Sequence, residues 1–590
     1  MRIGTSDDPL HRTAARRRDA IVALLLALFL SLCWTINDWP QVGQLNLPDN
    51  DDMMRLAQVR DLVAGQAFND WTQYRLAPPE GAPMHWSRIN DVGIAAIILA
   101  ARPFLGAHGA ELLAVILYPA LLFAAYLFLS GRIARRLGGA SAALVAIVVA
   151  ALAYPANSLF LPGRIDHHAL QIVLILGAVL ALMRRPTPAN GVGAGICIAF
   201  SLGIGLETAP YVAAVIAVLC GQWIWRGEAE RNRLIAAGAA TGGVTLLLLL
   251  FARPTYWTAE WCDAFTPASS SATLAAAGAW IALGFLSPKL PGWKTRLGLA
   301  GAAGAAVLAF ALLRYPVCLT GPYGPMDPFV RSAFMDNVVE AQGMFEHRFL
   351  SVGFPSGGLM AAALLVAGWF LATRPLRRRA ALPLVAVLAV SAAVTLFQVR
   401  GAYLGSAVAA PLLAQLILAA RQAPRWRGLA VAGAWLASAG MVYLIVPERI
   451  DRMLAPQIRA SFLVHRGCNA GDVWQQLDRY PAGTVMAPMD RAAYIIGSTH
   501  HGSVAAGYHR NNRGNRAMYD FFLADPDEAR RIGARWGTDY VAICPRDFVE
   551  LDLANAYPDS LAARLIRGDR PAWLEPLPLR DTGLKFYRVR

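Results

Sequence analysis

The first three quarters of the chain alternate between long apolar blocks and short polar connections. The blocks are roughly 17–22 residues long, which is enough for a helix to cross a hydrocarbon layer about 30 Å thick. This pattern predicts a polytopic α-helical membrane protein with about thirteen transmembrane helices. We place them at residues 20–36, 109–130, 138–158, 168–183, 189–205, 209–225, 233–252, 272–287, 298–314, 357–373, 380–398, 402–420 and 429–446.

Two apolar blocks, residues 92–107 and 20–36, are not assigned by length and hydropathy alone. Residues 92–107 are interrupted by Pro103, and counting them as a full span would move every later basic loop across the membrane. We therefore predict an interfacial or re-entrant helix that packs on protein. The block at 20–36 is followed by no small-x-small cleavage site, which predicts a retained span rather than a signal peptide.

The net charge of +15 follows the topology. Basic residues gather in the short loops between blocks, as in GRIARR at 131–136 and TRPLRRR at 373–379. Cytoplasmic loops of membrane proteins carry this excess of Lys and Arg, so we expect no nucleic-acid partner. Residues 1–19 are then a cytoplasmic basic N-terminus, and the main external loops are residues 37–91, 159–167, 253–271 and 315–356.

Composition separates a membrane domain, residues 20–446, from the rest of the chain. Apolar residues make up 56% of the sequence and charged residues only 16%, whereas soluble proteins are about one quarter charged. After residue 446, strand-like pieces (GTVMAP, DYVAIC) alternate with helix-like ones, which predicts an external α/β domain at 447–590. Cys468 and Cys544 lie in this domain, but their spacing does not decide whether they pair.

Acidic residues are concentrated in the first external loop, where LPDNDDMMRLAQVRDL precedes an amphipathic helix. One interpretation is that Asp49 or Asn50 caps the helix and the other acids favour its N-terminal dipole. The other is a metal-binding or acid–base cluster at the membrane surface, with Asp51 and Asp52 as the catalytic candidates.

The second external loop, LPGRIDHH, brings together an acid and two imidazoles. Asp166 and His168 are two positions apart in an extended segment, so both can face one side. A carboxylate and an imidazole suit a divalent cation such as Mn²⁺ or Mg²⁺, and Arg164 beside them is placed to bind phosphate. The alternative is an ordinary solvated turn.

Two later external positions carry single charged residues of interest. Glu340 lies in VVEAQ within the long irregular loop 315–356, and such loops are commonly functional. Arg400, in LFQVRGAYL, ends a span where its guanidinium could bind an anionic headgroup. The alternatives are a solvated glutamate and a snorkelling anchor. Glu207, in GIGLETAPYV, lies at another external span end and ranks below these two.

The order of these features resembles the catalytic subunit of oligosaccharyltransferases, which are membrane glycosyltransferases of the GT-C class, and the archaeal branch is most similar. The resemblance covers residues 20–446. It rests on Asn50–Asp51 in the first external loop, on the Gly-x-x-Asp-His-His motif at 163–168, on Glu-Ala-Gln at 340–342, and on Arg400 in a late span.

The resemblance implies roles for these residues. Asp51, Asp166 and His168 would hold a divalent metal, Glu340 would orient the acceptor, and Arg400 would bind the phosphate of a lipid-linked donor. Asp51 would in addition orient or deprotonate the acceptor nucleophile.

The resemblance weakens in the C-terminal domain. Protein-modifying members carry a Trp-Trp-Asp-Tyr-Gly motif for the acceptor sequon, but the corresponding segment here reads GTVMAPMDRAAYIIG, in which only Asp490 matches. The polar stretch THHGSVAAGYHRNNRG is predicted to contact acceptor or glycan, or else to be a plain structured loop. Its candidate residues are His500, His501, His509 and Arg510.

We therefore predict a metal-dependent glycosyltransferase of the plasma membrane that uses a polyprenyl-phosphate or -diphosphate-linked glycan. The acceptor would be a glycan, a lipid or a protein, and the site and the C-terminal domain would face the periplasmic or extracytoplasmic side. One alternative is an oligosaccharyltransferase that glycosylates asparagine. Another is a flippase for lipid-linked sugars, although transporters usually place polar groups at the midplane rather than at span ends.

Overall fold

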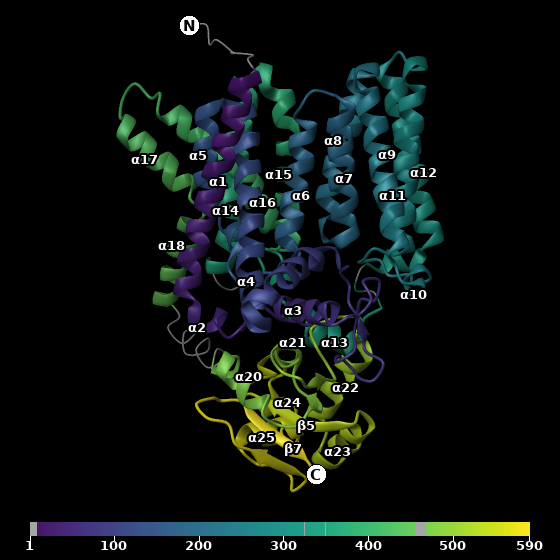
Figure 1. Cartoon of the computed structure of the whole chain (residues 1–590), viewed down its shortest axis with the longest axis vertical. Helices are drawn as coiled ribbons and strands as arrows, with labels where there is room; N and C mark the ends of the chain where they lie inside the picture. The colour runs from purple at the N-terminus through teal and green to yellow at the C-terminus, as the bar shows by residue number, and fades with distance from the viewer. Residues whose placement is uncertain (1–8, 322, 324, 348–349, 455–466) are drawn as a thin grey trace.

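The computed structural model describes residues 9–321, 323, 325–347, 350–454 and 467–590. A bundle of long helices occupies one end of the molecule, and a smaller part that contains a β-sheet occupies the other (Figure 1). The described chain begins with α1 at the outer end of the bundle and ends in the sheet part. The connections that carry the candidate site residues lie between these two parts.

The helices of the bundle account for every predicted span. Within the described residues, nine helices are long and apolar enough to cross a membrane, one bent pair passes the same test, and three apolar helices are shorter. The chain is therefore a multi-pass membrane protein. The helices are α1 (Pro9–Asn37), α4 (Ile89–Gly138), α5 (Ala140–Ala151), α6 (His168–Leu182), α7 (Pro188–Ile204), α8 (Ala209–Arg226), α9 (Glu228–Leu250), α11 (Pro267–Leu286), α12 (Trp293–Arg314), α14 (Leu350–Thr373), α15 (Arg378–Phe397), α16 (Gly401–Ala420), α17 (Arg427–Ser438) and α18 (Gly440–Leu454).

The last predicted span, residues 429–446, is not one straight helix. It consists of α17 and α18, which are bent by 76° relative to each other. Gly440 begins α18 directly against the backbone of Tyr154, where an added Cβ would lie 2.3 Å from the Tyr154 nitrogen. This close approach depends on tertiary packing and leaves no signal in the hydropathy pattern.

The apolar block at 92–107 belongs to α4, but it is set apart from the long second half of that helix. Gly106 interrupts the helix with φ 70° and ψ −179°, a conformation that favours glycine. Before this break, Val92, Leu99 and Phe104 expose their apolar side chains, Phe104 to 85%. An interfacial helix that ends at Gly106 and leads into a single crossing fits these observations.

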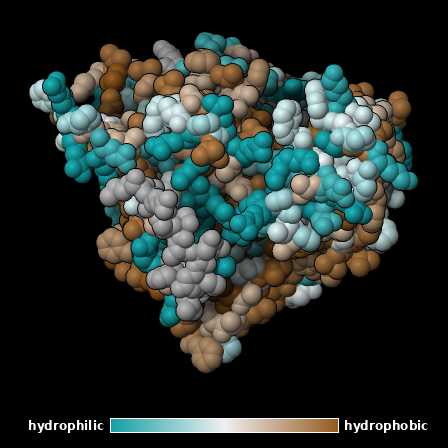
Figure 2. Space-filling view, turned by 90° about the horizontal axis from the view of Figure 1, so that it is seen from above, coloured by the Kyte–Doolittle hydropathy of each residue, from teal (hydrophilic) through white to brown (hydrophobic). Residues whose placement is uncertain are grey.

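The basic loops contact one another at the outer end of the bundle. Asp19 near the start of α1 is fully buried and binds Arg135 at the end of α4, with an Nε–Oδ2 distance of 2.8 Å. Arg377, from the loop before α15, donates to the Leu137 carbonyl. Seen from above, this face is largely hydrophilic at its centre and hydrophobic around its edge (Figure 2). The positions agree with the charge pattern, which puts these loops on one side of the membrane.

Between the bundle and the sheet part lie short elements that build the site. The longest of them is α3 (Asn50–Val63), which packs on α21 of the C-terminal part. The others are α2 (Trp39–Val42), the antiparallel strands β1 (Thr72–Gln73) and β2 (Ala82–Pro83), α10 (Pro254–Trp257), α13 (Pro328–Ala333), and the 3-10 turns η1 (Ala156–Phe160), η2 (Leu206–Thr208), η4 (Pro316–Thr320), η5 (Met335–Asn337) and η6 (Val339–Ala341). Two further 3-10 turns, η3 (Ser287–Lys289) and η7 (Pro375–Arg377), connect α11 to α12 and α14 to α15 at the outer end of the bundle.

The C-terminal part is an α/β unit with a five-stranded sheet of order β4-β3-β5-β7-β6. Strand β3 is parallel to β4 and β5, whereas β7 is antiparallel to β5 and β6. A disulfide joins Cys468 and Cys544. The elements are α20 (Gly471–Leu477), β3 (Thr484–Met486), α21 (Met489–Ser498), β4 (Gly502–Ser503), α22 (Asn512–Leu523), α23 (Pro526–Arg535), β5 (Thr538–Ile543), η8 (Val549–Leu551), α24 (Leu553–Ala556), α25 (Leu561–Arg567), β6 (Leu574–Leu577) and β7 (Lys585–Val589).

Helices α7 and α9 pack backbone to backbone through two glycines spaced four apart. A Cβ at Gly191 would lie 2.3 Å from the Arg233 carbonyl oxygen, and one at Gly195 would lie 2.4 Å from the Ala237 carbonyl oxygen. Small residues at this spacing are a common way for membrane helices to approach closely.

We predict that Gly195→Ala lowers the free energy of unfolding by about 1–3 kcal/mol, because the added methyl forces the two backbones apart. Gly193→Ala is the matched control, since an added Cβ there meets open space. Thermal unfolding of both variants in detergent tests the prediction. Equal melting temperatures for the two variants would contradict it.

Candidate active site

The N-terminus of α3 fixes the second external loop in place. Asp49 caps the helix by accepting the Asp51 N–H at 3.2 Å, as one of the two interpretations of this segment predicted. The buried carboxylate of Asp52 accepts the backbone N–H groups of Ile165 at 2.8 Å and Asp166 at 2.9 Å. Asp52 therefore holds the Asp-His-His segment against α3 and does not line the cavity described below.

Arg55, one turn further along α3, holds the Asp166 side chain from behind. It is fully buried, lies 4.4 Å from the Trp86 ring centroid, and donates to Asp91 and Asp166, both at 3.1 Å. His167 Nδ1 lies 2.6 Å from the same Asp166 oxygen, Oδ1. Because two cationic donors converge on Oδ1, the other oxygen, Oδ2, is the one left to bind a ligand.

The protonation of this group follows from its charges. Burial alone would raise the pKa of Asp166, but His167, His168 and Arg55 hold that pKa well below its ordinary value. Burial alone would lower the pKa of His167, but Asp166 and Glu207 raise it to about 9. A pKa above neutrality favours the protonated His167 ring, which offsets the negative charge of Asp166. A protonated ring has no lone pair with which to bind a metal.

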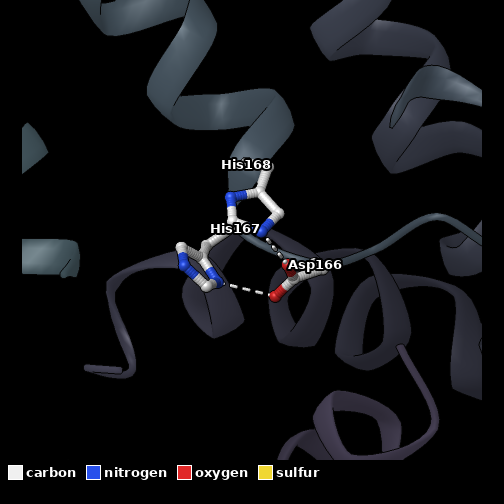
Figure 3. A group of neighbouring side chains, drawn as sticks. All are labelled: Asp166, His167 and His168. Carbon is white, nitrogen blue, oxygen red and sulfur yellow. Dashed lines mark hydrogen bonds and ion pairs between the residues drawn. The ribbon is translucent and has the colours of Figure 1, made fainter. Parts of the chain in front are cut away.

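His168 approaches the opposite side of the Asp166 carboxylate (Figure 3). Its Nε2 lies 3.3 Å from Asp166 Oδ2, and its Nδ1 lies 3.1 Å from Glu207 Oε2. A carboxylate on one imidazole nitrogen fixes the tautomer and directs the other nitrogen toward a metal. The sequence ranked Glu207 too low, although an acid at a span end soon after the Asp-His-His motif was the available signal.

One potential ligand atom from each of Asp166, His167 and His168 lies within 4.8 Å of the others. The sequence prediction grouped Asp51 with Asp166 and His168, and Asp51 is outside this compact group among the described residues. It nevertheless faces the same cavity, and burial together with the charges of Asp166, Asp49 and Glu340 raises its pKa well above the ordinary value. Because these carboxylates repel one another, binding of a cation beside Asp51 would be favourable.

A cavity of about 510 Å³ collects most of the predicted residues. Tyr403 donates to Glu340 at 2.8 Å, and Arg400 lies 3.5 Å from Glu207 and 4.0 Å from Glu340. The predicted residues in the cavity wall are Asp51, Arg164, Asp166, His168, Glu340, Arg400 and His509. These residues come from four external segments and the C-terminal part, and residues 206–210 and 262–263 bring two more external segments to the same wall.

Arg164 is engaged differently from the prediction. Its Nη1 lies 2.8 Å from Asp49 and 3.0 Å from Asp52, so its guanidinium is paired with two carboxylates. Burial alone would lower the pKa of Arg164, but these two carboxylates raise it well above the ordinary value. The geometry favours a role in holding the loop over a role in binding donor phosphate.

The polar stretch of the C-terminal part is divided between two locations. His509 and Arg510 both bind Asp263, at 2.8 and 2.6 Å, beside the cavity. His500 binds Asp478 and the Tyr480 carbonyl instead, and the buried His501 contacts the Leu477 carbonyl at 3.1 Å. His500 and His501 therefore do not reach the cavity, because the turn before β4 directs them onto the segment around α20.

Asp490 lies in the wall of a separate cavity of about 530 Å³, on another side of the α3 N-terminus. His85 was not among the residues predicted from the sequence. It lies in the wall of the main cavity, with its ring centroid 5.5 Å from that of His509. Burial and the neighbouring His509 ring lower the pKa of His85 to about 3, so the His85 ring stays neutral.

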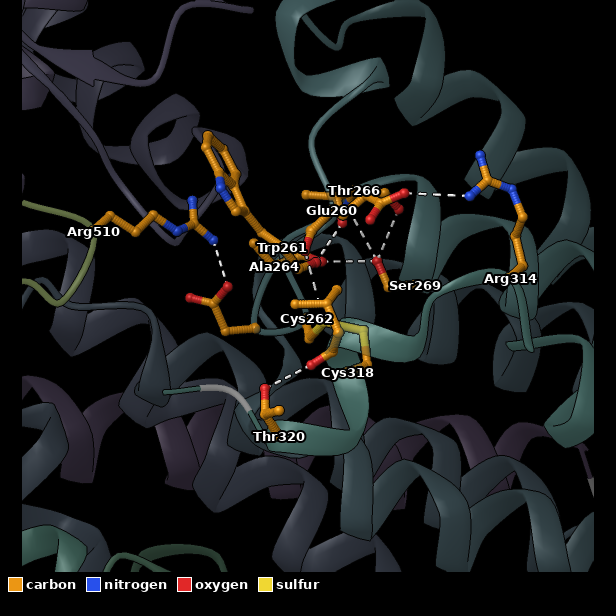
Figure 4. The surroundings of a disulfide bond; sticks show 12 residues. Glu260, Trp261, Cys262, Ala264, Thr266, Ser269, Arg314, Cys318, Thr320 and Arg510 are labelled. Atoms are coloured by element: carbon orange, nitrogen blue, oxygen red, sulfur yellow. Dashed lines mark hydrogen bonds and ion pairs between the residues drawn. A yellow bond between two sulfur atoms is a disulfide. The ribbon is translucent and has the colours of Figure 1, made fainter. Parts of the chain in front are cut away.

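A second disulfide, Cys262–Cys318, closes one side of the cavity and was not predicted (Figure 4). It joins loop 253–271 to loop 315–356. The next residue, Asp263, binds Arg510, whose guanidinium lies 4.0 Å from the Trp261 ring centroid. The bond therefore ties the loop that carries Glu340 to the loop that holds the C-terminal part.

We predict that Cys262→Ser with Cys318→Ser speeds amide hydrogen exchange in residues 315–347 and around Asp263, because the bond constrains both loops. The matched control is Cys468→Ser with Cys544→Ser. The two bonds close loops of 56 and 76 residues, for which chain entropy gives similar stabilisation of about 4 kcal/mol. Faster exchange at the same positions in both variants would show only a global loss of stability.

Comparisons with known proteins give the fold. No family model matches the chain, and no curated protein matches it. It is similar to solved structures of the Archaeoglobus fulgidus oligosaccharyltransferase AglB. One holds an inhibitory peptide and a dolichol-phosphate, with a TM-score of 0.61, 14% identity and coverage of 97% of this chain and 74% of that one.

Two other structures of the same archaeal enzyme match equally broadly. A complex with Zn and sulfate has a TM-score of 0.60 at 15% identity, covering 96% of this chain and 73% of that one. A form tethered to an acceptor peptide containing an NVT sequon has a TM-score of 0.60 at 15% identity, covering 97% and 74%. At this identity the likeness establishes architecture: the chain has the GT-C fold of an oligosaccharyltransferase, as its sequence predicted.

Proposed function

We propose that the chain is a membrane glycosyltransferase that transfers a sugar or oligosaccharide from a polyprenyl-phosphate- or diphosphate-linked donor to an acceptor outside the cytoplasm. The observation that carries this proposal is the cavity at the span ends, where carboxylates, imidazoles and Arg400 converge. Leu206, Ala209 and Pro210, at the start of α8, form part of its wall. A donor anchored in the bilayer presents its phosphate at this depth, and an archaeal structure of the same fold holds dolichol-phosphate.

The side-chain atoms of Asp166 and His168 that face each other fit the ligand positions of a divalent cation. Asp166 Oδ2 is buried and makes no hydrogen bond within the described chain, and His168 Nε2 lies 3.3 Å away. Two ligand atoms at right angles around an ion, each about 2.1 Å from it, lie about 3 Å apart. Asp166 and His168 would hold Mn²⁺ or Mg²⁺, with Asp51 facing the same space, and a structure of the same fold holds Zn. When bound, the cation would offset negative charge on the departing phosphate.

Arg400 would bind the donor phosphate. Its distances to Glu207 and Glu340 exceed those of ordinary charged hydrogen bonds, and its Nε is buried without a hydrogen-bond partner among the described atoms. A phosphate accepts two parallel bonds from a guanidinium. The two glutamates meanwhile keep the guanidinium directed into the cavity.

Asp51 and Glu340 would act on the acceptor. Tyr403 fixes one oxygen of Glu340, and Asp51 is a half-buried carboxylate whose pKa is raised, which makes it a better proton acceptor. In this scheme Asp51 takes the proton from the acceptor nucleophile, and Glu340 orients that nucleophile. Asp52, Arg55 and Glu207 position the reacting side chains and do not themselves touch the substrate.

Asparagine glycosylation is the second candidate, because an archaeal structure of the same fold is tethered to a sequon peptide. The segment that would recognise the sequon leads into α21 at Met489 and lacks the tryptophan pair of the sequon motif. A flippase is less well supported, because the polar groups lie at span ends rather than within a passage between them.

We predict that Asp166→Ala and His168→Ala each lower transfer at least about hundredfold, because the loss of a metal ligand should exceed the 10–100-fold effect of losing a residue that supports one. Glu207→Gln should fall within that smaller range and recover partly with excess Mn²⁺. The assay uses purified protein, a synthetic polyprenyl-diphosphate glycan, and chelator with or without added Mn²⁺. Asp559→Ala, which changes an exposed carboxylate, is the control.

Movement of the donor headgroup across a liposome membrane without cleavage of the donor would instead support a flippase.

We predict that Arg400→Ala raises the KM for the donor about tenfold to a hundredfold and changes the KM for the acceptor less. The magnitude corresponds to the loss of one charged hydrogen-bond pair, about 1.5–3 kcal/mol. Arg314→Ala is the matched control, because Arg314 also ends a span but pairs with the exposed Glu260. A larger effect on the acceptor than on the donor would refute the role of Arg400.

A further inference from the structure

His509 enters the wall of the main cavity from the C-terminal part, and one of its ring nitrogens has no protein partner. Its Nε2 lies 2.8 Å from Asp263 Oδ2. Its Nδ1 makes no hydrogen bond within the described structure, although the ring lines the cavity. A carboxylate on one imidazole nitrogen fixes the ring and directs the other nitrogen away from itself. His509 therefore offers Nδ1 as a hydrogen-bonding position that the described chain does not use.

Asp263, which holds this ring, is itself held from several directions. The preceding residue, Cys262, takes part in the second disulfide. The Asp263 carbonyl accepts the Leu206 N–H at 3.2 Å. Arg510 donates to Asp263 Oδ1 at 2.6 Å and to the Met84 carbonyl at 2.7 Å. The imidazole is thus supported by fixed neighbours, as the side chains of pre-organised binding sites are.

The charges that support His509 cancel each other. Burial alone would raise the pKa of Asp263, but the hydrogen bond from His509 and the charge of Arg510 lower that pKa below its ordinary value. The ionised carboxylate is balanced by the Arg510 guanidinium at 2.6 Å. His85, the neighbouring ring in the cavity wall, is neutral. These surroundings suit an uncharged polar partner for Nδ1.

A hydroxyl group is the uncharged partner that fits Nδ1 in either protonation state of the ring. A neutral imidazole whose Nε2 hydrogen is bonded to a carboxylate keeps a lone pair on Nδ1, whereas a protonated ring has an N–H there. A hydroxyl both donates and accepts, so it can bond to either form. An amide N–H or a carbonyl oxygen would fit only one of them. The chemistry of the position therefore matches a sugar hydroxyl.

His509 lies on the side of the cavity where Arg400 would bind the donor phosphate. Its ring centroid is 5.5 Å from that of His85. His85 Nε2 lies 4.0 Å from Glu207 Oε1, and Arg400 Nη1 lies 3.5 Å from the same oxygen. All four residues line the cavity. Because the first sugar of the donor is bonded directly to the phosphate, a phosphate on Arg400 would bring that sugar close to His509.

We propose that His509 binds a hydroxyl group of the first sugar of the donor and so determines which sugar is accepted. The proposal rests on the proposed function, in which Arg400 binds the donor phosphate. The C-terminal part would then contact the sugar, while the membrane domain binds the phosphate and the lipid. A sugar that lacks this hydroxyl would leave Nδ1 without a partner, and sites built to bond a hydroxyl discriminate against such analogues.

The test uses the full-length protein and synthetic polyprenyl-diphosphate donors that carry glucose, galactose, mannose or N-acetylglucosamine. The donor cleaved fastest, by water or with a candidate acceptor, is compared with its monodeoxy analogues, one for each hydroxyl. We expect one analogue to lower kcat/KM about threefold to tenfold with the wild-type protein, the effect of one neutral hydrogen bond, and to cause no such loss with His509→Ala. The other analogues should behave alike with both proteins, because intrinsic differences in donor reactivity cancel in this comparison.

Two substitutions separate hydrogen bonding by Nδ1 from a structural role of the ring. His509→Asn places an amide near the position of Nδ1 and should retain part of the selectivity. His509→Gln places its amide near the position of Nε2, keeps a donor for Asp263, and should lose the selectivity. His500→Gln is the matched control, because His500 also pairs with a carboxylate, that of Asp478, but lies away from the cavity. It should leave every constant unchanged.

The failure of this inference and the failure of the proposed function give different results. Equal losses of kcat/KM for every donor in the His509 variants would show a structural role and overturn the inference. A rise in the acceptor KM with unchanged selectivity among donors would overturn it as well. The proposed function stands in both cases, because the donor is still cleaved. If the wild-type protein cleaves none of the donors, the proposed function fails and the inference fails with it.

Discussion

The site depends on one buried contact, in which the Asp52 carboxylate accepts two successive backbone N–H groups of the Asp-His-His loop. This contact joins a helix that follows the first span to a loop that precedes α6. Arg55 lies beneath the same junction and fixes one oxygen of Asp166. Without this arrangement, acids placed far apart in the sequence would have no fixed relation to one another, and the cavity would lose its most defined wall.

Positive and negative side chains are unevenly distributed around the cavity. Arg55 and the protonated His167 neutralise one side of Asp166, while Asp51, Glu207 and Glu340 face the open space. Functional sites commonly depart from the rule that buried charges are fully paired. The negative charge gathered here favours the binding of a cation and the guanidinium of Arg400, which pairs with Glu207.

Much of the fold could be predicted from the sequence, because a helix that crosses a bilayer must be apolar over a set length. The bend at Gly440 could not, since it follows from the approach of Tyr154 in three dimensions. Asp166 and His168 were identifiable as candidates because an acid and imidazoles at an external span end are uncommon, and Glu340 because it lies in a long irregular external loop. Arg55 and His85 resemble ordinary polar residues of a helix and a loop, and only the fold shows what they touch. His500 and His501 were misplaced because neighbours in sequence on either side of a short strand need not share a face.

The Cys262–Cys318 bond also bears on how the chain is assembled. Cys262 precedes α11 and Cys318 follows α12, so the two sulfurs meet only when this helical hairpin has crossed the bilayer and returned. The bond can therefore form only when α11 and α12 are inserted as a pair. In a chain whose hairpin had not returned to the same face, Cys262 and Cys318 would stay on opposite sides of the bilayer and could not pair.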